Sequence, residues 1–183
     1  MDAAFSDAVL GQALPQGATA ALQEASRERG DAQRELAALM RAQALAAEHP
    51  AVLIALYRYH FYGHRPRPAR DVARRALVVS AVALGLPKVW REVPARALPG
   101  ARYDAATRFY LFSLKGYAYL SLRLNERIEA RDALALLRAL DPDDCVGGAL
   151  LEAVRQRALV GDIEGAGDEQ AFGAAAWARL APQ

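Results

Sequence analysis

Cysteine and long apolar runs are both scarce in this sequence. Cys145 is the only cysteine among 183 residues. An internal disulfide is therefore excluded, and we expect a reducing, cytoplasmic setting. No stretch reaches the about 18 uncharged apolar residues that a membrane-spanning helix needs. The first residues, MDAAFSDAVL, carry aspartates and no early lysine or arginine, a pattern unlike that of a secretory signal.

Strand patterns are missing as well. No segment alternates polar and apolar residues over the length of a strand, and no Asn-Gly or Asp-Gly hairpin turn occurs. The chain instead consists of helix-like segments separated by proline, glycine or asparagine, residues that end helices. Such segments pair into antiparallel hairpins when their connections are short. The breaks fall at 15–17, 30–31, 49–50, 63–68, 85–87, 94–100, 125, 141–142 and 161–167. We therefore predict an all-α protein.

The clearest pair of helices lies between residues 104 and 142. Asp104–Leu124 has a helical pattern, and Asp104 is suited to cap its first turn. A turn follows at Asn125, and Pro142 ends the second helix. The apolar stripe of this second helix has the spacing i, i+4, i+7 and consists of Ala130, Leu134 and Leu137.

The stretch LSLRLNERIEARDALALLRALDPDD resembles the second half of a tetratricopeptide repeat (TPR). Asn125 stands where the turn of that repeat often has glycine, and Pro142 where it has a closing proline, whereas Leu137 departs from the usual alanine. The same spacing recurs at Ala69, Ala73 and Ala76, and at Ala38, Ala42 and Leu45 before Pro50. The resemblance covers roughly residues 31 to 160, with irregular spacing between repeats. It implies antiparallel helical hairpins stacked as a short α-solenoid, a right-handed superhelix.

This organisation predicts one helical domain over residues 1–160, interrupted by an insertion or long loop at 86–103. The glycine-rich residues 161–167 (GDIEGAG) follow as a linker. Residues 168–183 then form a short amphipathic segment, with Phe172, Ala176 and Leu180 on one stripe beside Trp177. We expect this segment to cap the last hairpin. A sharper hypothesis is that it docks in the groove of its own or of another chain.

Charge is unevenly distributed along the chain, although the net charge is only +2. Residues 56–108 carry eleven Lys or Arg against three Asp or Glu, a balance of +8, and residues 125–170 carry five against eleven, a balance of −6. The middle of the chain should therefore present basic surface and the C-terminal third acidic surface.

Two chemical readings of the segment LYRYHFYGHRPRP at 56–68 compete with a binding role. His60 and His64 are four apart and would share a helical face as metal ligands, and together with Cys145 they are the candidates for a metal protein or helical enzyme. Gly63, Pro66 and Pro68 nevertheless predict that the helix ends near His64. The basic region 58–108, interleaved with aromatics, is the candidate for nucleic-acid binding, which the acidic remainder and the shortage of lysine disfavour.

Ten of the fourteen aromatic residues lie in two blocks, at 57–62 and 103–119. Both blocks fall in the first helix of a predicted hairpin, and the TPR resemblance implies that this helix lines a concave groove. The rings are either core packing or part of that groove. With the neighbouring arginines, a groove of this kind would favour an acidic peptide. We therefore predict a non-catalytic protein–protein interaction module, without cofactor, whose contact residues are Tyr57, Arg58, Phe61, Arg65, Arg74, Tyr110 and Tyr117.

Overall fold

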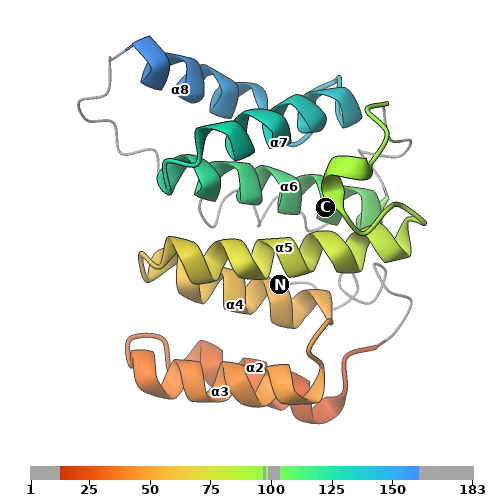
Figure 1. Cartoon of the computed structure of the whole chain (residues 1–183). Helices are drawn as coiled ribbons and strands as arrows, with labels where there is room; N and C mark the ends of the chain where they lie inside the picture. Colours follow the sequence, from red (N-terminus) through yellow and green to blue (C-terminus); the bar gives the residue numbers. More distant parts are fainter. Residues whose placement is uncertain (1–12, 97, 99–103, 161–183) are drawn as a thin grey trace.

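The computed structural model describes residues 13–96, 98 and 104–160, and all regular structure in these ranges is helical (Figure 1). The helices are α2 (Gln16–Arg27), α3 (Ala32–Leu45), α4 (Pro50–Tyr62), α5 (Pro66–Ala83), α6 (Ala105–Arg123), α7 (Arg127–Leu140) and α8 (Ala149–Val160), with the 3₁₀ turn η1 (Trp90–Glu92) between α5 and α6. The prediction of an all-α fold is confirmed. Within these ranges no helix is long and apolar enough to cross a membrane.

The helix ends of the 104–142 pair follow the predicted signals. The Asp104 carboxylate accepts a hydrogen bond from the backbone N–H of Thr107 at 2.6 Å and caps α6. Asn125 takes a left-handed φ of 59°, the conformation for which glycine is usual at helix ends. Helix α7 ends at Leu140, directly before Asp141-Pro142. Local sequence therefore determines where these two helices begin and end.

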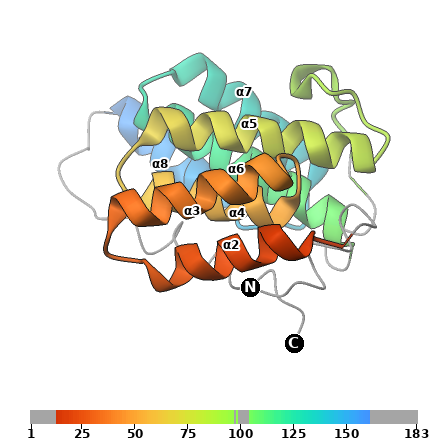
Figure 2. The same cartoon turned by 90° about the horizontal axis from the view of Figure 1, so that it is seen from below.

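Consecutive helices pack on one another in chain order. Helices α2 and α3, α4 and α5, and α6 and α7 form close pairs, and α5 also packs extensively on α6. Figure 1 shows the pairs stacked from α2 and α3 at the bottom to α8 at the top, and Figure 2 shows α2 and α7 at opposite edges. The insertion predicted at 86–103 contains η1 and no α-helix among its described residues. The proposed linker 161–167 and the segment 168–183 lie outside the described residues.

Helix α6 runs through the middle of the core. Fourteen of its nineteen residues are buried, and Phe109, Tyr110 and Leu114 are completely inaccessible. Opposite it, α5 contributes the predicted small-residue stripe Ala69, Ala73 and Ala76, which is at most 4% exposed. The α3 stripe differs from the prediction, because Ala38 and Ala42 are buried while Leu45 is 55% exposed.

Arginines from the basic middle of the chain form ion pairs with acidic residues at the start of α7. Arg70 of α5 pairs with Glu126 just before α7, and Arg91 of η1 pairs with Glu129 and with Asp132, the latter at 2.7 Å. These ion pairs fasten α5 and η1 to α7. The ring centroids of Trp90 in η1 and Tyr117 in α6 lie 5.9 Å apart, so η1 also packs against α6. Part of the predicted basic surface is therefore neutralised within the molecule.

Candidate partner-binding groove

A groove of about 890 Å³ lies between α2 and α4 and extends to the turns at both ends of α3. Its volume falls in the range of roughly 300–1,000 Å³ that binding pockets occupy. Apolar side chains form much of its wall. The residues that line it include Leu22, Ala25, Arg29, Ala32, Glu35, Leu39, Ala51, Ala55, Arg58, Tyr59, Tyr62, Gly63 and Arg65.

Helix α4 presents one continuous stripe to this groove. Ala51, Ala55, Arg58 and Tyr62 follow one another at intervals of four, three and four residues, the repeat of one helical face. The two alanines leave space at the N-terminal end of α4. Tyr62 at the C-terminal end is 46% exposed. The stripe therefore changes from apolar and recessed to aromatic and basic along its length.

Positive charge dominates the groove. Among the described residues that line it, Arg29, Arg58 and Arg65 stand against one carboxylate, that of Glu35. A guanidinium is planar, remains protonated and binds carboxylates through two parallel hydrogen bonds. An apolar wall with three guanidinium groups suits a ligand that is both apolar and acidic.

A contact between Tyr59 and Arg65 links the groove to the layer of α2 and α3. The Tyr59 hydroxyl donates to the carbonyl of Ala32, the first residue of α3, at 2.9 Å. The same oxygen accepts a hydrogen bond from Nη1 of Arg65 at 3.0 Å. The Arg65 guanidinium also lies 4.0 Å from the centre of the Tyr59 ring, a cation–π distance. Tyr59 is only 7% exposed, so it orients the arginine from inside the protein.

Gly63 makes room for this arginine. A β-carbon at position 63 would meet Nη2 of Arg65 and would lie 2.8 Å from its Nε. The φ of Gly63 is −80°, which any residue can adopt. Glycine is therefore needed at position 63 because a side chain would displace Arg65, and not because of its backbone conformation.

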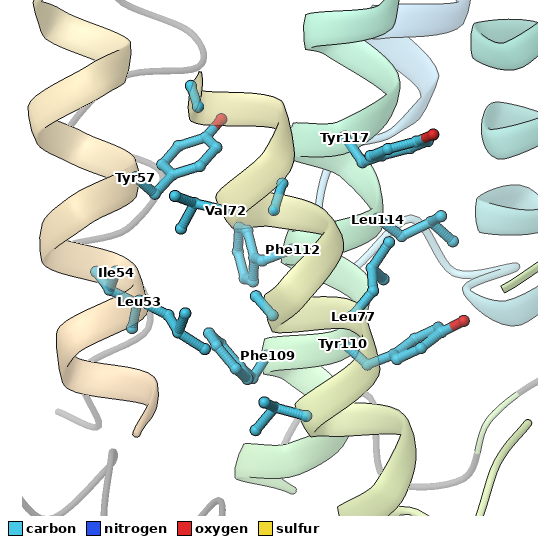
Figure 3. Packing of buried hydrophobic residues seen from close by; sticks show 14 of the residues in the cluster. Leu53, Ile54, Tyr57, Val72, Leu77, Phe109, Tyr110, Phe112, Leu114 and Tyr117 are labelled. Carbon is cyan, nitrogen blue, oxygen red and sulfur yellow. The ribbon is translucent and has the colours of Figure 1, made fainter. Parts of the chain in front are cut away.

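Three of the predicted contact residues are buried elsewhere. Tyr57 and Tyr117 are 5% exposed and Tyr110 is inaccessible. Burial raises the pKa of Tyr110 to about 12 and also raises that of Tyr57. Figure 3 shows Tyr57 pointing from α4 toward α5 and α6, whereas Tyr110 and Tyr117 point away from α4. This corrects the prediction, because these rings are core packing and cannot contact a partner.

Phe61 and Arg74 also lie outside the groove. Phe61 is half-buried and packs against Tyr57 and Tyr119, each with a centroid separation of 5.6 Å. Arg74 has a 55% exposed side chain on α5 and pairs with Asp71 one turn away. Of the seven predicted contact residues, Arg58 and Arg65 line the groove.

Sequence reasoning missed α2 and the alanines of α4 as parts of the groove. The available signal was the spacing Ala51, Ala55, Arg58, Tyr62, in which small residues continue into polar ones on one face. Helix α4 is apolar on most of its circumference, so this face had no clear contrast with its neighbours.

The histidine pair does not share a helical face. Helix α4 ends at Tyr62, and His64 takes a left-handed φ of 54°, so the prediction that the helix ends near His64 is confirmed. Burial, and secondarily the charge of Arg65, lower the pKa of His60. Cys145 is exposed and follows α7. Across residues 13–96, 98 and 104–160, no three His, Cys, Asp or Glu residues are grouped as metal ligands.

No protein-family model and no solved structure matches the chain. A protein from Azotobacter chroococcum mcd 1, described as an uncharacterized 19.8 kDa protein in the nifW 5′ region, is 41% identical to it over 115 residues. The matched part makes up 62% of this chain and 64% of that protein, so the match spans less than two thirds of the relative's length.

Proposed function

We propose that this protein is a non-catalytic, cytoplasmic protein–protein interaction module built on TPR-like helical hairpins. Its partner contributes a short segment that is apolar on one side and carries carboxylates. The segment occupies the groove between α2 and α4. A helix laid into an apolar groove is a common way in which such segments are recognised.

The observation that supports this proposal most directly is the charge of the groove. Of the described residues that line it, Arg29, Arg58 and Arg65 are basic and Glu35 is acidic, while Leu22 and Leu39 form part of the apolar wall. Because Tyr59 holds the Arg65 side chain and Gly63 leaves room for it, Arg65 loses less side-chain freedom when it binds a carboxylate.

A peptide display selection against the full chain tests the proposal. We expect the selected peptides to combine Asp or Glu with apolar residues spaced three or four apart. Arg58→Glu should weaken their binding roughly 10- to 100-fold, because it replaces a charge-assisted hydrogen bond with repulsion. Arg74→Glu is the matched control: it makes the same change of charge at an exposed site outside the groove. Selected peptides that bind wild-type protein and Arg58→Glu equally would contradict the assignment of the groove.

The relative's description offers one defined protein to test beside the peptides. Its gene lies in the region 5′ of nifW. The nifW product of Azotobacter chroococcum mcd 1 can be mixed with wild-type protein, Arg58→Glu and Arg74→Glu, and complex formation measured by calorimetry. Binding that only Arg58→Glu abolishes would support both the groove and this partner.

A further inference from the structure

We propose that residues 1–12 of the same chain occupy the α2–α4 groove and compete with the partner for it. This inference rests on the proposed function of that groove and adds its regulation. Three properties of the molecule support it: the place where the described chain begins, the direction of the two helices that form the groove, and the spacing of side chains in residues 1–12.

The described chain begins in the groove itself. Ala13 and Leu14, which come directly before α2, are among the residues that line it. Residue 12 is therefore one peptide bond away from the groove, and residues 1–12 reach it without a long linker. A segment tethered through a short connection has an effective concentration in the millimolar range.

Helices α2 and α4 begin at the same end of the groove. A β-carbon at Gly17, in the first turn of α2, would lie 3.1 Å from Cδ1 of Leu45, the last residue of α3. Helix α4 begins at Pro50, shortly after α3 ends, and its Tyr59 contacts Ala32 at the opposite end of α3. Both helices therefore run opposite to α3. A segment that lies in the groove and precedes α2 passes the start of α4 first and its C-terminal end last.

Residues 1–12 (MDAAFSDAVLGQ) combine acidic and apolar side chains. They contain two aspartates and no lysine or arginine, a formal side-chain charge of −2. The described lining of the groove has the opposite sign, with three arginines and one glutamate. Phe5 and Val9 are four residues apart, and Asp2 precedes Phe5 by three. In a helix this spacing would put the three side chains on one face, with the carboxylate at its far end.

This face complements the stripe that α4 presents to the groove. On α4, Ala51 and Ala55 are four residues apart and Arg58 follows three residues later. Read in the opposite direction, the segment has the same spacing, with two larger apolar side chains followed by a carboxylate. The seven residues span about 10 Å of helix in both. In antiparallel contact the larger side chains would fill the space beside the two alanines, and the Asp2 carboxylate would face Arg58.

Arg58 has a charge to offer such a contact. Its side chain is half-buried, and it forms no ion pair with a carboxylate of residues 13–96, 98 and 104–160. A partly buried charge is costly unless it is paired. An acidic side chain that enters the groove beside Arg58 therefore removes an unfavourable feature of the empty groove.

The contact is short enough for a partner to displace it. An isolated helix shorter than about 12–15 residues is marginal in water, so the segment should become helical only as it docks. At an effective concentration of about 1 mM, a segment with a dissociation constant of about 0.1 mM fills the groove about nine-tenths of the time. It then weakens the apparent affinity of the partner about tenfold.

Hydrogen exchange of the full chain, followed by mass spectrometry, tests whether the segment is docked. We expect the backbone amides of residues 3–12 to be protected in the wild type and to exchange several times faster in Asp2→Arg, which brings like charges together. Asp7→Arg is the matched control: it makes the same change of charge on the opposite side of the helix and should retain the protection. Equal exchange in the wild type and in both variants would overturn the proposal.

A charge swap tests the contact with α4 directly. Arg58→Glu should also remove the protection of residues 3–12, and Asp2→Arg/Arg58→Glu should restore it, because the two charges are again opposite. Protection that is lost in both single variants and is not regained in the double variant would overturn the placement of Asp2 beside Arg58.

Analytical ultracentrifugation separates docking within one chain from exchange between two. A monomer with protected residues 3–12 supports the proposal. A dimer that Asp2→Arg dissociates would place the segment in the groove of another copy and would overturn docking within the chain.

A further variant, Phe5→Ala/Val9→Ala, distinguishes failure of this inference from failure of the proposed function. A peptide from the display selection should bind this variant about tenfold more tightly than it binds the wild type. If its affinity is the same for both proteins but still depends on Arg58, the groove binds partners and the competition by residues 1–12 is wrong. If the segment is protected through Arg58 and no peptide binds even Phe5→Ala/Val9→Ala, the partner-binding function is wrong, and the competition with it.

Discussion

The Arg65 guanidinium lies 4.0 Å from the centre of the Tyr59 ring and donates a hydrogen bond to the Tyr59 hydroxyl at 3.0 Å. The same hydroxyl donates to the carbonyl of Ala32. One phenol therefore connects three elements: the end of α4, the start of α5 and the start of α3. The position of a charge in the groove is coupled in this way to the packing of the first two hairpins.

Removing the Tyr59 hydroxyl should lower the stability of the protein. Tyr59→Phe deletes two hydrogen bonds and retains the ring, so we expect a loss of about 1–2 kcal/mol in the free energy of unfolding. Urea denaturation measures this loss. Tyr62→Phe is the matched control at an exposed position of the same helix and should change stability by about 0.5 kcal/mol or less. Equal losses in the two variants would argue against the bridging role of Tyr59.

Gly63→Ala should move Arg65 without changing any charge. The new β-carbon would collide with the guanidinium, which is the flexible end of a long side chain and can rotate away. Because the φ of Gly63 is −80°, the helix end should tolerate alanine, and the melting temperature should stay near that of the wild type. Peptide binding should fall about three- to tenfold, since one of the three arginines would leave its position. Calorimetric titration checks this, and unchanged affinity would show that the position of Arg65 does not matter for binding.

A second glycine tests the packing of α4 on α6. A β-carbon at Gly116 would lie 2.9 Å from the hydroxyl oxygen of Tyr57, which is buried. Gly116→Ala should therefore cost about 1–3 kcal/mol through overpacking, even though alanine favours helix more than glycine does. In the Tyr57→Phe background the obstructing oxygen is absent, and the same substitution should cost far less. Chemical denaturation of the four proteins gives the coupling energy, and strictly additive losses would refute this contact.

His60 should make the protein less stable as pH falls. Burial and the neighbouring Arg65 lower its pKa below 6.5 in the folded state, whereas the unfolded chain titrates near 6.5. As pH falls below 6.5, the unfolded state binds the proton first, so the free energy of unfolding decreases until the folded pKa is passed. His60→Asn cannot titrate and should lose less stability than the wild type between pH 7 and pH 5. Thermal melts across this range measure the difference, and parallel pH profiles would exclude His60 as the cause.

The ends of the helices were predictable because their causes are local. Asp104 caps α6 through a backbone group three residues away, and Asn125 adopts its left-handed conformation within a single turn. The end of α4 at Tyr62 likewise follows from the neighbouring Gly63 and the prolines beyond it. These signals act over fewer than five residues, so the sequence by itself determines the helical class and the lengths of most helices.

The identity of the groove depended on contacts between distant segments. Tyr57 and Arg58 are adjacent in the sequence, yet one is buried against α6 and the other lines the groove. Periodicity cannot choose between them, because α4 and α6 carry apolar residues on nearly all sides. The choice is made by the elements that cover each face. Helices α5 and α6 cover Tyr57, and Glu129 of α7 accepts a hydrogen bond from the Tyr117 hydroxyl, whereas the groove between α2 and α4 leaves Arg58 half-buried. The sequence by itself determined an all-helical chain with most of its helix ends, and only the tertiary packing decided which aromatic and basic side chains remain available to a partner.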